Sequence, residues 1–143
     1  MNFLLDTNVA CEQLRKLPDA TVIEWISRQR SERLFVSTIA LAEIQFGIGI
    51  LEPSRRRAAL EDWLVDFRAS LGKRLLPLDQ EVAIAWGNLR AAARRAGRPI
   101  PFMNAFIAAT AEVHGLTVVT RNVRDFEVWG GPVFNPWTED PPA

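Results

Sequence analysis

A carboxylate, Asp6, stands directly after a short apolar run at the start of the chain, Phe3-Leu4-Leu5. An apolar run without alternating polar residues is typical of a strand that is covered on both faces, as in a parallel sheet. Ligands bind at the carboxyl ends of such strands, so Asp6 is a candidate catalytic or metal-binding acid. The alternative is structural: Asp6 or Asn8 caps the helix predicted over residues 9–15 by accepting hydrogen bonds from its free N–H groups. Further acidic residues near the same strand end would favour the catalytic or metal-binding role over the capping role.

Glu43 is the second candidate, because it interrupts an apolar helix face. The spacing predicts a helix over residues 39–51 in which Ile39, Glu43, Phe46 and Ile50 share one face. A carboxylate on an inward face needs partners, since an unpaired buried carboxylate takes up a proton instead. The alternative is a carboxylate at the rim of the face that reaches water or an arginine. We interpret Glu43 as a functional residue.

Two further oxygen-bearing positions lie in the second half of the chain. Asn104 is on a face of small and apolar residues in the helix predicted over residues 102–114. A second clear strand is predicted over residues 116–120, and polar residues follow its end as they follow the first strand. Those at or after this strand end are Thr120, Arg121, Asn122 and Asp125.

These positions together suit a hard divalent cation. If Asp6, Glu43, Asn104 and Asp125 converge, they form a ring of oxygens almost free of nitrogen and sulfur donors, the preference of Mg²⁺ and Mn²⁺. Several carboxylates held together without a metal would repel one another and take up protons. The pattern therefore favours a metal that activates water or stabilises the leaving oxygen in phosphodiester cleavage.

The elements that must position these residues alternate between strands and helices. This alternation predicts an α/β fold with a central, mainly parallel sheet and helices on both faces, in a single domain over residues 1–143. The last six residues are predicted to be a frayed tail. Strands are predicted over residues 2–8, 34–36, 75–78, 116–120 and 133–134, and helices over residues 9–15, 19–30, 39–51, 54–70, 80–96 and 102–114.

Composition narrows the classes further. Lysine plus arginine and aspartate plus glutamate balance at 17 each, which argues against a wholly basic nucleic-acid-binding surface. Local basic patches are candidates for contacts with phosphates or with an acidic partner, although each arginine could be an ordinary surface charge. The single cysteine, Cys11, cannot form an internal disulfide, and no signal peptide or membrane-spanning apolar run is recognised, so we expect a cytoplasmic protein without membrane contact. The candidate arginines are Arg55, Arg56, Arg57, Arg90, Arg94, Arg95 and Arg121.

Four segments in register resemble the PIN domain, specifically VapC-type toxins of bacterial toxin-antitoxin modules. They are LLDTNV (4–9), ALAEIQFGI (40–48), FMNAFIAATA (102–111) and VVTRNVRDF (118–126), and the ending FNPW (134–137) is similar to the FitB-like branch. The resemblance implies a three-layer α/β/α fold and an endoribonuclease that uses Mg²⁺, with Mn²⁺ as a possible substitute. It also implies a homodimer, neutralised by a VapB-type antitoxin through which it reaches operator DNA.

Carried over residue by residue, the resemblance makes Asp6 and Glu43 the first two acids of the site and Asn104 the third position. The fourth acid falls in the last segment, where Asp125 is the working assignment and Asn122 the alternative, with Asn8 and Thr120 in supporting roles. Asn104 departs from the family, which normally has aspartate there, so we expect weak metal binding and little cleavage. Two explanations stay open: a substitution made to silence a toxin, which is our working hypothesis, and a natural variant that binds without cutting.

Other functions remain to be compared with the nuclease. A catalytically silent PIN-like module that binds a partner protein or RNA would show RNA affinity without metal dependence. A phosphatase with an aspartyl nucleophile is disfavoured, because no second aspartate follows Asp6 by two residues. Neither a Walker-type GKS nor a G-x-G-x-x-G loop is present.

Overall fold

Five parallel strands form one sheet in the order β3-β2-β1-β4-β5. The structure is a computed structural model and describes residues 1–139. Because β1 lies in the middle, with the next strand in sequence on one side and β4 on the other, its carboxyl end is where ligands bind in open α/β sheets. The strands are β1 (Phe3–Leu5), β2 (Leu34–Ser37), β3 (Leu75–Leu76), β4 (Thr117–Val119) and β5 (Val133–Phe134).

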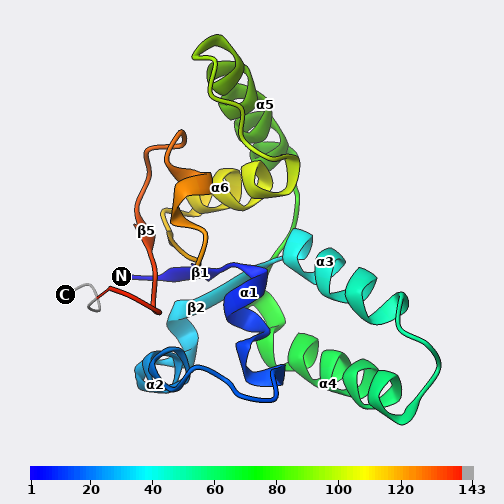
Figure 1. Ribbon diagram of the computed structural model, residues 1–143. Coiled ribbons are helices and arrows are strands. Elements are labelled where there is room, and N and C mark those ends of the chain that lie inside the picture. The colour runs from blue at the N-terminus through cyan, green and yellow to red at the C-terminus, as the bar shows by residue number, and fades with distance from the viewer. Residues whose placement is uncertain (140–143) are drawn as a thin grey trace.

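Helices cover both faces of this sheet. Figure 1 shows α5 and α6 on one face and α1, α2 and α4 on the other, so the predicted three-layer α/β/α fold is confirmed. Among residues 1–139, no helix is both long and apolar enough to cross a membrane. The helices are α1 (Thr7–Ala10), α2 (Ala20–Arg28), α3 (Thr38–Gly49), α4 (Arg55–Leu71), α5 (Gln80–Arg95) and α6 (Phe102–His114).

Polar side chains begin most of these helices. Asp19, Ser37 and Asp79 each accept a hydrogen bond from a backbone N–H in the first turn of α2, α3 and α5. Such caps satisfy donors that have no partner within the helix. The start of each helix after a strand is therefore fixed by local sequence.

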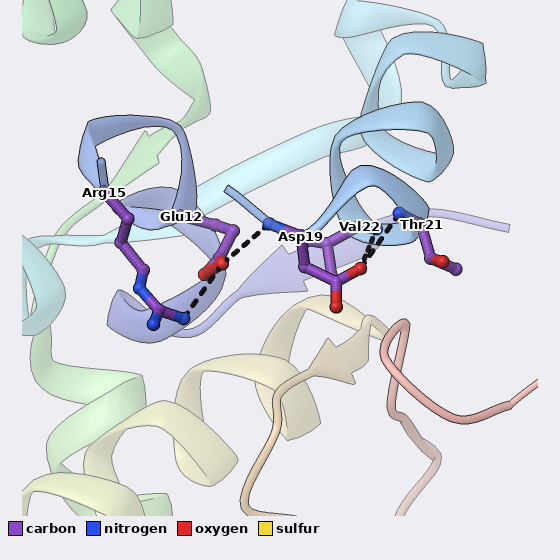
Figure 2. A network of polar contacts seen from close by, with 5 residues as sticks. All are labelled: Glu12, Arg15, Asp19, Thr21 and Val22. Carbon is purple, nitrogen blue, oxygen red and sulfur yellow. Dashed lines mark hydrogen bonds and ion pairs between the residues drawn. The ribbon is translucent and has the colours of Figure 1, made fainter. Parts of the chain in front are cut away.

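The first predicted helix is shorter than expected. In place of one helix over residues 9–15, α1 ends at Ala10 and a 3₁₀ turn follows over Glu12–Leu14. The cause is Glu12, whose side chain is only 2% exposed. Its Oε1 accepts from the backbone N–H of Asp19 at 3.1 Å and from Arg15 Nη1 at 3.2 Å, as Figure 2 shows. These contacts fold the chain back toward α2, and sequence reasoning missed them.

The inward face of α3 also differs from the prediction. Ile39 is buried as expected, but Phe46 and Ile50 are 69% and 67% exposed. The second half of the helix instead packs Ile44 and Ile48 against α4 in a small separate core cluster. Apolar residues occur on every side of this helix, so their spacing alone could not identify the buried face.

The chain after β5 is ordered further than predicted. The carbonyl of Asn135 accepts from the backbone N–H groups of Thr138 and Glu139, which form a turn rather than a frayed end. Residues 140–143 of the predicted tail lie outside the described residues. One main core cluster joins the sheet to both helix layers, and the single domain over residues 1–143 stays a prediction.

Candidate active site

Asp6 occupies the carboxyl end of the central strand and is almost fully buried, with 6% exposed. Its backbone N–H donates to the Val119 carbonyl of β4 at 2.9 Å. Its Oδ1 accepts from the Thr7 backbone N–H at 2.8 Å, so it does cap α1. Its Oδ2 accepts from the Thr120 hydroxyl at 2.7 Å. The capping role and the buried site therefore coexist in one side chain, held by two neutral donors.

The residues predicted to support Asp6 contact it or one another. The Asn8 side-chain amide lies 3.5 Å from Asp6 Oδ2, at the limit of a hydrogen bond. The backbone N–H of Asn122 donates to the Thr120 hydroxyl oxygen at 3.0 Å, which leaves the hydroxyl hydrogen directed at Asp6. The Arg121 backbone N–H lies 3.4 Å from Asn8 Oδ1. The polar ends of β1 and β4 thus form one connected cluster.

Burial and like charges act on the two inner acids. Burial is the main cause that raises the pKa of Asp6 above its ordinary value of 3.8; the charge of Asp125 adds to it, while the bonds from Thr120 and Thr7 oppose it. Burial also raises the pKa of Glu43, and the charge of Asp6 adds to this. Within residues 1–139, no lysine or arginine forms an ion pair with any of these three acids. Asp6 is therefore electrostatically coupled to Glu43 and Asp125 without a protein cation.

The candidate ligands are oxygen donors, which a hard cation prefers, but Asn104 contributes no negative charge. Burial and mutual repulsion disfavour the charged forms of Asp6 and Glu43, and a cation would reverse this. The Thr7 hydroxyl is near enough to Glu43 to lower its pKa, yet this buried oxygen makes no regular hydrogen bond to residues 1–139. In the same range, no three acidic, histidine or cysteine side chains lie close enough together to hold a metal ion.

The third and fourth predicted positions, Asn104 and either Asp125 or Asn122, are less buried than Asp6. Asn104 is half-buried in the first turn of α6, a helix that contacts both α3 and β4. In Figure 1 the first turn of α6 lies near the edge of the sheet at which β1 ends and α3 begins. Asp125 and Asn122 are both exposed around a 3₁₀ turn, Val123–Phe126, and the charge of Asp125 helps to raise the pKa of Asp6. Their roles as ligands stay predictions.

A groove of about 550 Å³ begins at Thr7 and Glu43 and runs between α1, α3 and α4. Cys11 lies in its wall, where burial and the charge of Glu43 raise the pKa of the thiol to about 11. Three basic side chains line it: Arg15, Lys16 and Arg56. Sequence reasoning singled out only Arg56, because Arg15 and Lys16 reach the groove through the fold-back that follows Glu12.

The other candidate arginines have different surroundings. Arg57 is engaged within the fold: its Nε bonds Glu61 Oε1 at 3.0 Å and its Nη1 donates to the Leu51 carbonyl at 2.9 Å. Arg94 lines a separate hollow formed by α5 and the segment that follows it, with Trp86 and Arg90. Arg55 and Arg95 are exposed. None of these contacts tests RNA binding.

Comparison with known proteins agrees with this arrangement. Residues 3–129 match the PIN domain family. Two relatives are each 36% identical over 135 residues: the VapC ribonuclease Y4jK of Sinorhizobium fredii, with 94% of this chain and 96% of the relative covered, and the toxin FitB of Neisseria gonorrhoeae, with 94% and 97% covered. A solved structure of FitAB bound to an IR36 DNA fragment superimposes with a TM-score of 0.91 at 34% identity, covering 96% of this chain and 97% of that one. The chain therefore belongs to the PIN-domain family, in the branch that contains the VapC and FitB toxins.

Proposed function

We propose that this chain is the toxin of a toxin-antitoxin module and that its chemistry is metal-dependent cleavage of RNA. The observation that carries the proposal is the buried Asp6, coupled to Glu43 and Asp125 and held by neutral donors alone. A set of acids without a protein cation is the arrangement expected where an external cation binds. The ribonuclease and toxin names of its relatives support the same class of reaction.

Asp6, Glu43 and Asp125 would hold Mg²⁺, or Mn²⁺ in its place, together with the side-chain oxygen of Asn104. The metal, when bound, supplies an activated water and stabilises the leaving oxygen of the phosphodiester. The chain itself orients the first ligand. The Thr7 N–H and the Thr120 hydroxyl fix the two oxygens of Asp6 separately, and such outer partners set the direction of a ligand's lone pairs.

Asn104 leaves the proposed site one negative charge short. Asparagine keeps one acceptor oxygen but brings an NH₂ donor instead of a charge. At about 4 Å, one charge is worth roughly 1 to 4 kcal/mol for each unit of cation charge at effective dielectrics of 80 to 20. We therefore expect this chain to bind the metal weakly and to cleave RNA slowly or not at all.

The partners of the proposed toxin follow from its relatives. The similar solved structure is that of FitAB bound to a DNA fragment, and we propose that this chain pairs with a VapB-type antitoxin and reaches operator DNA only through it. We also propose a homodimer, for which the exposed Phe46 and Ile50 of α3 offer apolar surface. Cleavage of cellular RNA would take place in the cytoplasm.

RNA cleavage with Mg²⁺ or Mn²⁺, comparing this chain with Asn104→Asp, tests the proposal. We expect the variant to cleave structured RNA in a reaction that a chelator stops, and this chain to be at least about 30-fold slower. No chelator-sensitive cleavage by the variant would reject the nuclease function. The alternative, a silent RNA- or protein-binding module, is favoured by the absence of a three-acid cluster in residues 1–139. RNA affinity that does not change with metal or with Asn104→Asp would support it.

A further inference from the structure

A cation-π pair lies at the polar end of β4 and joins it to the last turn of the described chain. The Arg121 guanidinium carbon is 5.3 Å from the ring centroid of Trp137. Arg121 is exposed, whereas the indole is half-buried and packs on the main core. The tryptophan is thus held by the fold, while the guanidinium in contact with it is accessible from solvent.

The turn over FNPW fixes the tryptophan in this place. Asn135 Oδ1 accepts from the Trp137 backbone N–H at 2.9 Å. The Asn135 side-chain amide lies 3.5 Å from the Arg121 carbonyl. Asn135 therefore contacts the backbones of both Arg121 and Trp137 and holds the two residues next to each other.

The backbone of Arg121 adjoins the candidate active site. Arg121 directly follows Thr120, whose hydroxyl donates to Asp6, and its own backbone N–H lies 3.4 Å from Asn8 Oδ1. A site built of acids repels the phosphates of RNA, and a cation at its rim offsets that repulsion. The position of Arg121 is one where such a cation would act on the substrate as it reaches Asp6.

We propose that Arg121 and Trp137 form a nucleotide-positioning subsite, at which an unpaired RNA base stacks on the Arg121 guanidinium where it lies over the Trp137 ring. This inference rests on the proposed ribonuclease function. Unstacked bases are bound in this way by aromatic side chains and by arginine planes, with little dependence on base identity. Both residues are positioning residues: they hold the strand so that its phosphodiester lies at the acids.

The test is binding of a labelled single-stranded RNA oligonucleotide in chelator, followed by fluorescence anisotropy. Arg121→Ala and Trp137→Leu are each expected to weaken binding about tenfold, the size of the loss of one stacked base. Trp137→Phe should retain most of the affinity. Arg121→Lys should fall between parent and Arg121→Ala, because lysine keeps the charge but has no plane.

Trp63→Leu is the matched control for Trp137→Leu. Trp63 is also half-buried and packs against an aromatic ring, Phe67 at 4.8 Å, but it belongs to the cluster between α3 and α4. Both variants should lower the melting temperature, and only Trp137→Leu should weaken RNA binding. A melting-temperature change without a change in affinity for either Trp137→Leu or Arg121→Ala would show that the pair only anchors the chain end and would overturn the proposal.

A duplex of the same sequence separates stacking from simple charge attraction. Base pairs cannot stack on the subsite, so Trp137→Leu should bind duplex RNA as the parent does. Arg121→Ala also removes a charge, so it should lose some affinity for duplex RNA, but less than for the single strand. Equal losses for single strand and duplex would overturn the stacking role. Cleavage by Asn104→Asp is measured separately. If the variant does not cleave RNA but Arg121→Ala and Trp137→Leu weaken single-strand binding, the subsite is supported and the nuclease function is rejected. If the variant cleaves RNA and the two substitutions leave binding unchanged, only the subsite is rejected.

Discussion

Two carboxylates six residues apart, Asp6 and Glu12, are both buried but are stabilised in opposite ways. Glu12 accepts from a cation, Arg15, and from the backbone N–H of Asp19 (Figure 2). Asp6 accepts only from neutral donors and is coupled to two other acids. A buried carboxylate that has its own cation is complete within the fold. A buried carboxylate that has no protein cation and lies near other acids can instead bind a cationic ligand. This difference distinguishes the functional acid, Asp6, from the structural acid, Glu12.

Asp6→Asn should give the largest effect. In the Asn104→Asp background, the substitution removes one negative charge next to a divalent cation. That charge contributes about 2 to 8 kcal/mol to metal binding, since it is worth roughly 1 to 4 kcal/mol for each unit of cation charge. Chelator-sensitive cleavage should fall by at least about 30-fold. Rates measured at the same subsaturating concentration of Mn²⁺ or Mg²⁺ check this, and an unchanged rate would remove Asp6 from the site.

Thr120→Val should give the next largest effect, because it removes the hydroxyl that donates to Asp6 Oδ2 at 2.7 Å. Loss of an outer partner typically lowers metal affinity about 10- to 100-fold. Calorimetric titration with Mn²⁺ measures this change. Thr110→Val is the control, since its buried hydroxyl donates to the Phe106 carbonyl inside α6; equal loss in both variants would mean that Thr120 acts only through stability.

Glu12→Gln should affect stability but not metal binding. The substitution keeps the shape and one acceptor for the Asp19 N–H, but it removes the charge that Arg15 contacts, so we expect a loss of about 1 kcal/mol in the free energy of unfolding. Urea unfolding measures it. A change in Mn²⁺ affinity comparable to that of Thr120→Val would contradict the distinction between the two acids.

The pH dependence of unfolding should show the smallest effect, and it tests the buried charge of Asp6. Because burial raises the pKa of Asp6 above 3.8, the metal-free folded protein binds a proton there more tightly than the unfolded chain. Its stability therefore falls as pH rises from 3.8 through the raised value, and the penalty is then constant. Asp6→Asn removes this penalty, so in chelator the variant should gain stability relative to the parent across that window. A constant difference at all pH values would show that the charge of Asp6 costs nothing.

Local features were predictable from the sequence, and long-range ones were not. The first strand stops at Leu5, directly before Asp6, and not at residue 8 as predicted. The helices α2 and α3, capped by Asp19 and Ser37, depend on neighbouring residues and begin within one residue of their predicted starts. The burial of Glu12 depends on the chain returning from α2, and no local pattern marks it. The exposed Phe46 could not be foreseen, because α3 is apolar on every side and only contact with α4 selects the buried face.

The candidate site was predictable in part for the same reason. Thr120 was noted as the polar end of a strand, and its contact with Asp6 follows once β1 and β4 are neighbours. The groove residues Arg15 and Lys16 were missed, because they line the same groove as Glu43 only through the turn that Glu12 holds. The pairing of Arg121 with Trp137 was also missed, since it needs the turn at Asn135.

Calorimetric titration with Mg²⁺, comparing this chain with Asn104→Asp, tests the central claim most directly. The claim is that Asp6 lies in a metal site that lacks one charge. Restoring the charge at position 104 should tighten binding by at least about 30-fold, and adding Asp6→Asn should reverse the gain. Equal Mg²⁺ affinity in the chain with asparagine and the chain with aspartate would contradict the account, because the acids near Asp6 would then not form a metal site that residue 104 completes.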